Sequence, residues 1–215
     1  AILVYGAGRS SSGKSLVGVR AAVAKAAEPR LGEFNSQELA NTAFTIAANP
    51  RFGEFNVQNL ANIAWAFATV RHRNEALPAV LARAADPRLA EFNAQNLANV
   101  AWAFGTAGQL DEAVFVTLAR AAEPRLGELN AQEIANTAWA FARLGQLDEK
   151  LFVVLAREAE LRVSEFNAQD IANTAWAFAT LGQLDEKLFA ALARVAALRV
   201  SEFKAQGIAN TVWAF

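Results

Sequence analysis

The hydrophobic and polar positions of the chain follow a pattern that returns every 37 residues. The tripeptide EFN at 54–56 recurs at 91–93, as ELN at 128–130, as EFN at 165–167 and as EFK at 202–204, whereas an earlier EFN at 33–35 stands only 21 residues before the next. Self-similarity at a fixed period of this length is typical of repeat architectures. We therefore expect one solenoid domain, in which a degenerate unit, a truncated unit, four full units and a partial unit occupy residues 1–32, 33–53, 54–90, 91–127, 128–164, 165–201 and 202–215.

Each unit predicts two helices, and residues 165–201 illustrate the first. Asn167 is a suitable N-cap because its side chain can accept a free backbone N–H, and Asp170 completes a capping box. Glu133 and Glu38 fill the place of Asp170 in other units. Phe166 and Ile171 have the spacing of a hydrophobic staple. The apolar stripe of this helix consists of Ile171, Ala175, Phe178 and Ala179, with Ala172 and Trp176 beside it.

The second helix of this unit is predicted from Gly182 onward. Gly182 suits the left-handed backbone that ends a helix, and Asp185 is the next N-cap. Leu184 and Phe189 repeat the staple spacing, and the inner stripe is Leu188, Leu192 and Val195. One helix pair cannot bury its apolar face alone, but stacked pairs can. The predicted fold is all-α: an α-solenoid of stacked antiparallel helix pairs with a 37-residue repeat and an extended concave surface.

Composition removes several classes of function. The 215 residues include no cysteine and one histidine, His72, which excludes thiolate chemistry and histidine-rich metal sites. The formal net charge of −1 gives no overall basic signature. No apolar run reaches the roughly 18 residues that span a bilayer, so we expect no membrane insertion. The missing Met at position 1 predicts a fragment or a processed chain.

A phosphate-loop pattern, G-x-x-x-x-G-K-S, occupies Gly8 to Ser15. A working loop also needs a parallel sheet with an acidic metal partner, and no such sheet is predicted downstream. Alignment with the repeat places Gly13 on the interhelical Gly108, so we interpret the match as fortuitous. Other carboxylates recur at predicted helix starts, where the helix dipole favours them. We expect no enzyme, no metal, no cofactor and no small-molecule substrate.

The exposed face that the repeats share is where a solenoid carries function. On each first helix, four positions spaced i, i+3, i+7 and i+10 lie away from the predicted apolar stripe. The first varies in polar identity and the second is always Asn, a pattern suited to a modular reader of a polymer. The candidate RNA-binding residues on these helices are Asn59, Asn62, Asn96, Asn99, Glu133, Asn136, Arg143, Asp170, Asn173 and Asn210, and the third position holds Ala66, Ala103, Ala140 and Ala177.

Two structural alternatives stay open for these helices. The acids at the first position can serve only as capping-box residues. The Asn row can satisfy backbone groups between the layers, since buried amides usually have partners. The periodic tryptophans are better placed for the core than for stacking on bases; they are Trp65, Trp102, Trp139, Trp176 and Trp213.

Two series of basic residues keep the same period. The first is Lys25, Arg83, Arg120, Arg157 and Arg194, and the second is Arg30, Arg88, Arg125, Arg162 and Arg199. In a stacked array each series forms a stripe that could follow a phosphate backbone. Four members of the first series are therefore RNA-binding candidates: Arg83, Arg120, Arg157 and Arg194. The alternative is that the arginines complement helix ends or pair with nearby Glu. A phosphate track requires the arginines and the Asn row to share one face.

The sequence F-N-x-Q-x-[LI]-A-N-x-A-W-A-F-A, followed by L-G-Q-L-D-E-x-L-F, resembles the octotricopeptide-repeat and heptatricopeptide-repeat families over about residues 16–215. The resemblance implies a helical-repeat RNA-binding protein of the chloroplast or mitochondrion, acting in RNA processing, stability or translation on single-stranded RNA. If each full unit reads about one base, the footprint is about four to six nucleotides. The rival hypothesis is a protein-binding scaffold or a structural subunit of a larger complex.

Overall fold

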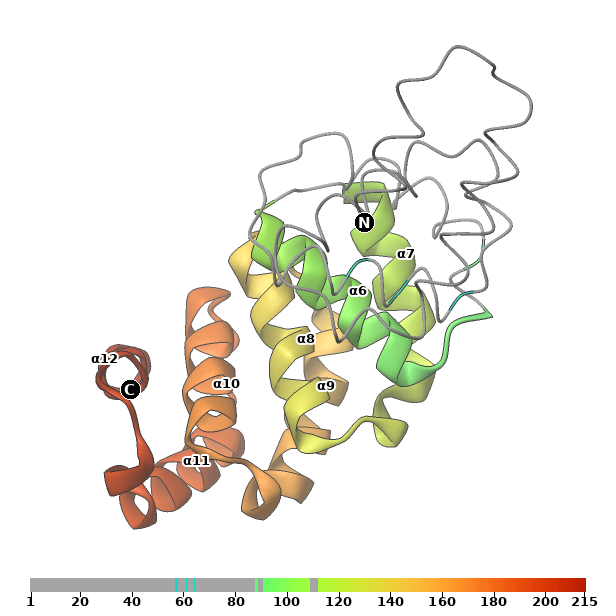
Figure 1. The fold of residues 1–215 in the computed structure, drawn as a ribbon. Coiled ribbons are helices and arrows are strands. Elements are labelled where there is room, and N and C mark those ends of the chain that lie inside the picture. Colours follow the sequence, from blue (N-terminus) through green and yellow to red (C-terminus); the bar gives the residue numbers. More distant parts are fainter. Residues whose placement is uncertain (1–56, 58–60, 62–63, 65–87, 89–90, 109–111) are drawn as a thin grey trace, which may run out of the picture.

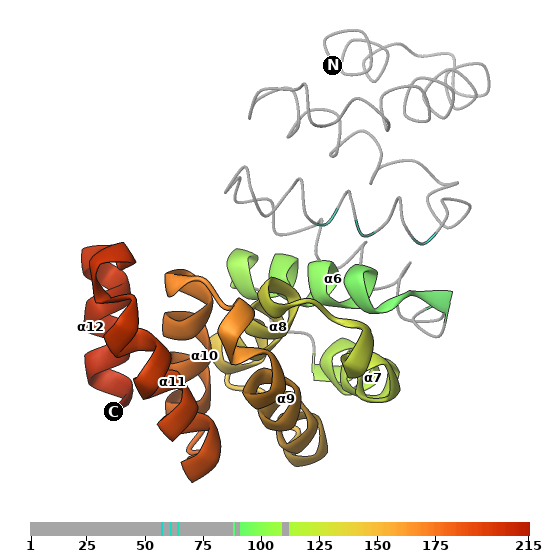
Figure 2. The same ribbon diagram turned by 90° about the horizontal axis from the view of Figure 1, so that it is seen from below.

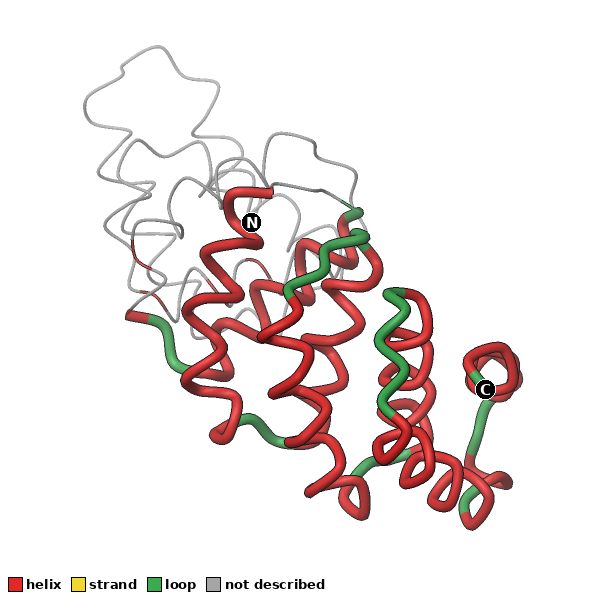
Figure 3. Tube along the Cα trace, turned by 180° about the vertical axis from the view of Figure 1, so that it is seen from behind, coloured by secondary structure: helices red, strands yellow, loops and turns green. Residues whose placement is uncertain are grey.

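The computed structural model describes residues 57, 61, 64, 88, 91–108 and 112–215. Helices and loops make up this part of the chain, and it contains no strand (Figure 3). The expected all-α solenoid is therefore confirmed. The α-helices are α6 (Ala94–Ala107), α7 (Glu112–Ala122), α8 (Ala131–Arg143), α9 (Glu149–Arg162), α10 (Ala168–Thr180), α11 (Glu186–Leu198) and α12 (Ala205–Ala214), and the short 3₁₀ helices are η4 (Glu123–Glu128), η5 (Val163–Glu165) and η6 (Val200–Glu202).

The helices stack in two layers (Figures 1 and 2). The A layer contains α6, α8, α10 and α12, which start at intervals of 37 residues, and the B layer contains α7, α9 and α11. Successive A helices pack against one another much more extensively than successive B helices do. A stack that is tighter on one side curves toward that side, so the A layer forms the inner, concave side of the solenoid.

Side-chain caps start the helices where the sequence predicts them. Asn93, Asn130 and Asn167 are extended residues whose side chains accept backbone N–H groups of the first turn of α6, α8 and α10. Asp148 and Asp185 do the same for α9 and α11. These caps satisfy N–H groups that a helix start leaves without a partner.

Glycines with a positive φ end the A helices. Gly108, Gly145 and Gly182 have φ angles of 65°, 65° and 68°. Residues with a Cβ rarely adopt this backbone, so the chain turns toward the B layer at the same place in each unit.

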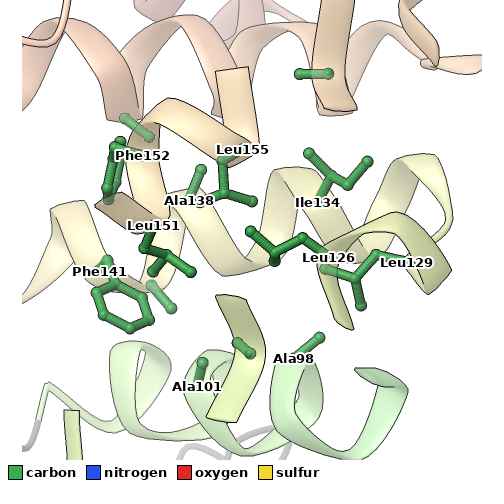
Figure 4. Packing of buried hydrophobic residues seen from close by; sticks show 14 of the residues in the cluster. Ala98, Ala101, Leu126, Leu129, Ile134, Ala138, Phe141, Leu151, Phe152 and Leu155 are labelled. Carbon is green, nitrogen blue, oxygen red and sulfur yellow. The ribbon is translucent and has the colours of Figure 1, made fainter. Parts of the chain in front are cut away.

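Apolar side chains of both layers form one continuous core. Figure 4 shows Ala138 and Phe141 of α8 beside Leu151, Phe152 and Leu155 of α9. A row of edge-to-face aromatic contacts runs along the stack and alternates between the layers, with ring centroids 4.9–6.5 Å apart. Its members are Phe104, Phe115, Phe141, Phe152 and Phe178, so each unit locks onto the next.

Small residues allow the A helices to approach closely. A Cβ built on Gly105 of α6 would lie 2.9 Å from the Cα of Ala140 in α8. Ala103, Ala140 and Ala177 are 5%, 0% and 0% exposed. The prediction that these alanines lie on an exposed face is therefore wrong, because the neighbouring A helices cover them.

Two members of the second arginine series, Arg162 and Arg199, each tie their unit to the one before it. Arg162 donates to the carbonyl of Gly127 at 2.6 Å and to the Glu158 carboxylate at 3.0 Å. Arg199 repeats this contact 37 residues later: it donates to the carbonyl of Ser164, which occupies the place of Gly127, at 3.2 Å and to that of Phe166. These arginines serve structural contacts, as the alternative reading of the series predicts.

One predicted staple does not form a buried contact. Leu184 is 66% exposed before α11, and Leu147, its counterpart before α9, is 44% exposed. The staple before the A helix is buried as expected, since Phe166 and Ile171 are both fully buried. The residue before the cap of a B helix therefore stays in contact with solvent, both before α9 and before α11.

Several predictions concern residues outside the described part of the chain. They are the phosphate-loop pattern at Gly8–Ser15, the units at 1–32 and 33–53, most of the unit at 54–90, and the candidates Asn59, Asn62 and Arg83.

We predict that Arg162→Ala lowers the free energy of unfolding by about 1–2 kcal/mol, because it removes two charge-assisted hydrogen bonds at a partly exposed site. Arg157→Ala in the same helix is the matched control. Its side chain is exposed and has no partner among the described residues, so its effect should stay within about 0.5 kcal/mol. Urea denaturation measures both, and equal losses would contradict the structural role of Arg162.

Candidate nucleic-acid interface

The two layers present two outer faces that point in opposite directions. Asn136 lies two residues from Ile134 and two from Ala138, both fully buried between the layers. Two residues correspond to a rotation of about 200° in an α-helix, so Asn136 points away from the core on the outside of the A layer. Arg157 is likewise two residues from the buried Leu155 and Ala159, and it points outward from the B layer.

The variable first-position residues serve the caps of the A helices. Glu133 accepts the backbone N–H of Asn130 at 2.9 Å, and Asp170 accepts that of Asn167 at 3.1 Å. Both therefore complete capping boxes. Asn96 and Asp170 are 6% and 5% exposed, which leaves little of either side chain for a ligand. Their role in RNA binding stays a prediction.

Asp170 is a buried carboxylate in the capping box of α10. Burial raises the pKa of Asp170 above its ordinary value, and the hydrogen bond from the Asn167 backbone partly opposes that rise. The equivalent position of α6 holds an uncharged amide, Asn96.

The constant Asn row lies half-buried on the outer side of the A layer. Its described members are Asn99, Asn136, Asn173 and Asn210. None of these four side chains makes a hydrogen bond within the part of the chain that the structure describes. The alternative that they satisfy backbone groups between layers therefore has no hydrogen bond to support it. Their amide donors and acceptors remain available at the surface.

A second amide row runs beside the first, and the sequence analysis did not single it out. Gln95, Gln132, Gln169 and Gln206 are exposed at the second position of each A helix. Each precedes an Asn of the row by four residues, and residues at i and i+4 are neighbours on a helix surface. The signal was present as the constant Gln of F-N-x-Q. We call these eight Gln and Asn residues the amide face.

The tryptophans border the amide face. Trp102, Trp139 and Trp176 are half-buried and pack against the core, as predicted, and the Trp139 ring lies next to Gly105. Trp213 on α12 is 62% exposed. Each Trp follows an Asn of the row by three residues, so an aromatic edge accompanies each pair of amides.

Charge is scarce on the amide face. Arg143, the last residue of α8, is exposed, whereas Thr106 and Thr180 occupy its place in α6 and α10. Lys204 replaces the capping Asn before α12 and is also exposed. The arginines of the first series are exposed on the other side of the molecule, on α7, α9 and α11: Arg120, Arg157 and Arg194. The arginines and the Asn row therefore do not share the one face that a combined phosphate track requires, and RNA contact by these arginines stays a prediction.

Within the described residues, no group of three or more His, Cys, Asp or Glu side chains is placed to hold a metal ion. No helix in that part of the chain combines the length and apolar character needed to cross a membrane.

The sequence matches one family model over most of its length. The model describes RNA-editing substrate-binding complex 6 protein, and the match covers residues 13–215. The chain belongs to this family. None of the curated proteins matches the sequence significantly. The family is RNA-related, as the resemblance implied, and the match does not point specifically to the octotricopeptide-repeat or heptatricopeptide-repeat families.

We predict that Asp170→Asn changes the pH dependence of stability. The raised pKa means that the folded chain holds a proton on Asp170 at pH values where the unfolded carboxyl, with a pKa of about 3.9, has released it. In that window wild-type stability falls as pH rises, because the folded state binds more protons than the unfolded state. The side chain that Asp170→Asn introduces does not titrate, so the variant should not lose stability in this pH window.

The free energy of unfolding of variant and wild type, measured in urea at several pH values from about 3 to 7, tests this linkage. The free energy of unfolding of the variant minus that of the wild type should increase as pH rises. Gln169→Asn, at the exposed neighbouring position, is the control and should keep the wild-type profile. Parallel profiles for Asp170→Asn and the wild type would refute the effect of burial on this carboxyl.

Proposed function

We propose that this protein is a non-enzymatic helical-repeat subunit of an RNA-editing substrate-binding complex, and that its amide face binds single-stranded RNA. Family membership supports the complex and the RNA substrate. Such complexes act on mitochondrial RNA, which favours the mitochondrion and gives no support to the chloroplast. Roles in RNA stability or translation find no specific support and are not part of the proposal.

The observation that carries the proposal is the double row of amides whose side chains make no hydrogen bond within the described residues. Each Gln or Asn amide offers two donors and an acceptor oxygen. The edges of unstacked bases present the complementary groups, and sequence-specific RNA recognition is concentrated on such single-stranded bases. The half-buried tryptophans beside the amides supply apolar edges against which a base can pack.

The repeat geometry fits a polymer ligand. Neighbouring packed helices are about 8–10 Å apart, so equivalent amides recur at about that interval along the concave side. An extended single strand has nucleotides close enough to place about one base at each unit, as in other helical-repeat readers.

The amide face carries few charges, and this determines how strongly RNA affinity should depend on salt. Arg143 and Lys204 are the exposed cations on the A side of the described chain. Affinity for a single strand falls with salt by a slope of about 0.7 per neutralised phosphate. We therefore expect a shallow salt dependence, equivalent to about one or two phosphate contacts, with most of the binding energy in base contacts.

A non-enzymatic role is proposed because the carboxylates of the A helices serve structure. Glu133 and Asp170 are held in capping boxes, so neither is positioned as an acid or base toward the amide face. The rival ligand is an extended peptide, whose backbone also offers alternating donors and acceptors to a row of amides. The RNA-binding assay described next distinguishes an RNA ligand from a peptide ligand.

We predict that Asn136→Ala/Asn173→Ala and Gln132→Ala/Gln169→Ala each weaken RNA binding by about tenfold, because each removes two amide contacts. The ligand is a single strand enriched from a randomised RNA pool, and fluorescence anisotropy gives Kd across a salt series.

The matched control is Gln146→Ala/Gln183→Ala, which removes two amides from the interhelical loops. Its Kd should equal that of the wild type. If no strand is enriched at low salt while the protein is folded, or if the loop variant loses as much affinity as the face variants, RNA binding by the amide face is refuted.

A further inference from the structure

The outer side of the B layer carries a regular array that RNA binding by the amide face does not use. On each B helix an aliphatic residue, an arginine and a second apolar residue follow one another at four-residue intervals, which keeps them on one side of the helix. Together they form what we call the arginine face: Val116 and Arg120 on α7 with Pro124 of η4, Val153, Arg157 and Leu161 on α9, and Ala190, Arg194 and Leu198 on α11.

The aliphatic members of this face are strongly exposed. Val153, Leu161 and Leu198 are 68%, 67% and 80% exposed, and Val116 is 48% exposed. Single exposed aliphatic residues are ordinary, but here they recur in register on successive helices and so form a patch. The free-energy gain from removing such side chains from water favours a covering partner.

The arginines of this face are exposed and have no partner among the described residues. Arg120, Arg157 and Arg194 make no hydrogen bond or ion pair there, in contrast to Arg162 and Arg199 of the second series. Lys150 and Lys187 are exposed near the starts of α9 and α11. Arginine is enriched at protein–protein interfaces, and the buried core of such an interface is more apolar than the rest of the surface.

We propose that the arginine face docks a partner protein, through a segment whose apolar side chains meet the aliphatic rows and whose carboxylates meet the arginines. The proposal rests on membership of a complex, which the proposed function includes, but not on RNA binding by the amide face. The two faces point in opposite directions, so this protein can hold RNA on its concave side and a protein partner on its convex side.

A protein fits this face better than a nucleic acid does. Glu123 and Glu160 are exposed three residues after Arg120 and Arg157, where they would repel a phosphate backbone. The exposed Val and Leu side chains offer a phosphate chain nothing to bind. A protein segment can match both the apolar rows and the alternating charges, which also gives specificity.

The test uses the complex isolated through a tag on the full chain and digested with ribonuclease. A zero-length reagent that couples amines to carboxylates, followed by mass spectrometry, reports the acidic residues that touch Lys150 and Lys187. We expect cross-links from both lysines to Asp or Glu of another protein. The triple change Arg120→Glu/Arg157→Glu/Arg194→Glu should reduce them by about tenfold or more, as loss of central interface residues does.

Two further variants separate the contributions. Val153→Ser/Leu161→Ser/Leu198→Ser should also lose the cross-links, because it removes the apolar part of the contact. Arg120→Lys/Arg157→Lys/Arg194→Lys keeps the charge and should retain more of the cross-links than the charge reversal does. Circular dichroism verifies that each variant is folded.

Three results would overturn the proposal. They are cross-links that survive the charge reversal or the serine substitutions, cross-linked partners that disappear on ribonuclease digestion alone, and a loss of RNA affinity in the charge-reversed protein. The anisotropy assay on the same variants distinguishes the two proposals. If the amide face does not bind RNA, the cross-links from the arginine face are still expected, because protein docking does not depend on RNA binding.

Discussion

Close contact between successive A helices is the constraint on which the rest of the structure depends. Gly105 lies so near Ala140 that an added Cβ would meet the Cα of Ala140 at 2.9 Å, and the alanines at this position are buried in α6, α8, α10 and α12. Tight packing on this side curves the stack toward the A layer. It also decides which side chains remain outside, because whatever the next A helix covers is lost as a binding surface. The amides and the edges of the tryptophans are among the residues left on the concave side.

The same constraint separates the two faces. Helices that bury one stripe between the layers must direct the opposite stripe to solvent, so the amides of the A layer and the arginines of the B layer diverge. The arginines at 162 and 199 lie near unit boundaries and bond to carbonyls of the preceding unit. Those at 120, 157 and 194 lie on the outer stripe and stay exposed. Two series with the same period thus have different roles, which are fixed by their position on the helix.

Much of this architecture is predictable from the sequence because its determinants are local. Asn167, Asp170 and Gly182 act through backbone groups a few residues away, and each behaves as its type and position predict. Which row of side chains on an A helix stays exposed is not determined by local sequence. Periodicity indicates which residues share a side of a helix, but not where the next helix packs, so the pattern places Ala140 on the surface and does not distinguish Gln132 as a candidate. Likewise, Leu184 has the spacing of a staple, but spacing along the chain does not determine burial, and Leu184 is 66% exposed.

The proposed RNA contact involves amides of the A layer that make no hydrogen bond within the described residues. It can be tested by titrating the ¹⁵N-labelled full chain with the enriched single strand and following the side-chain amide and guanidinium resonances. We expect the NH₂ signals of Gln132, Asn136, Gln169 and Asn173 to shift together, while the Nε–H signals of Arg120, Arg157 and Arg194 stay in place. Shifts confined to those arginines, with the amide signals unchanged, would contradict it.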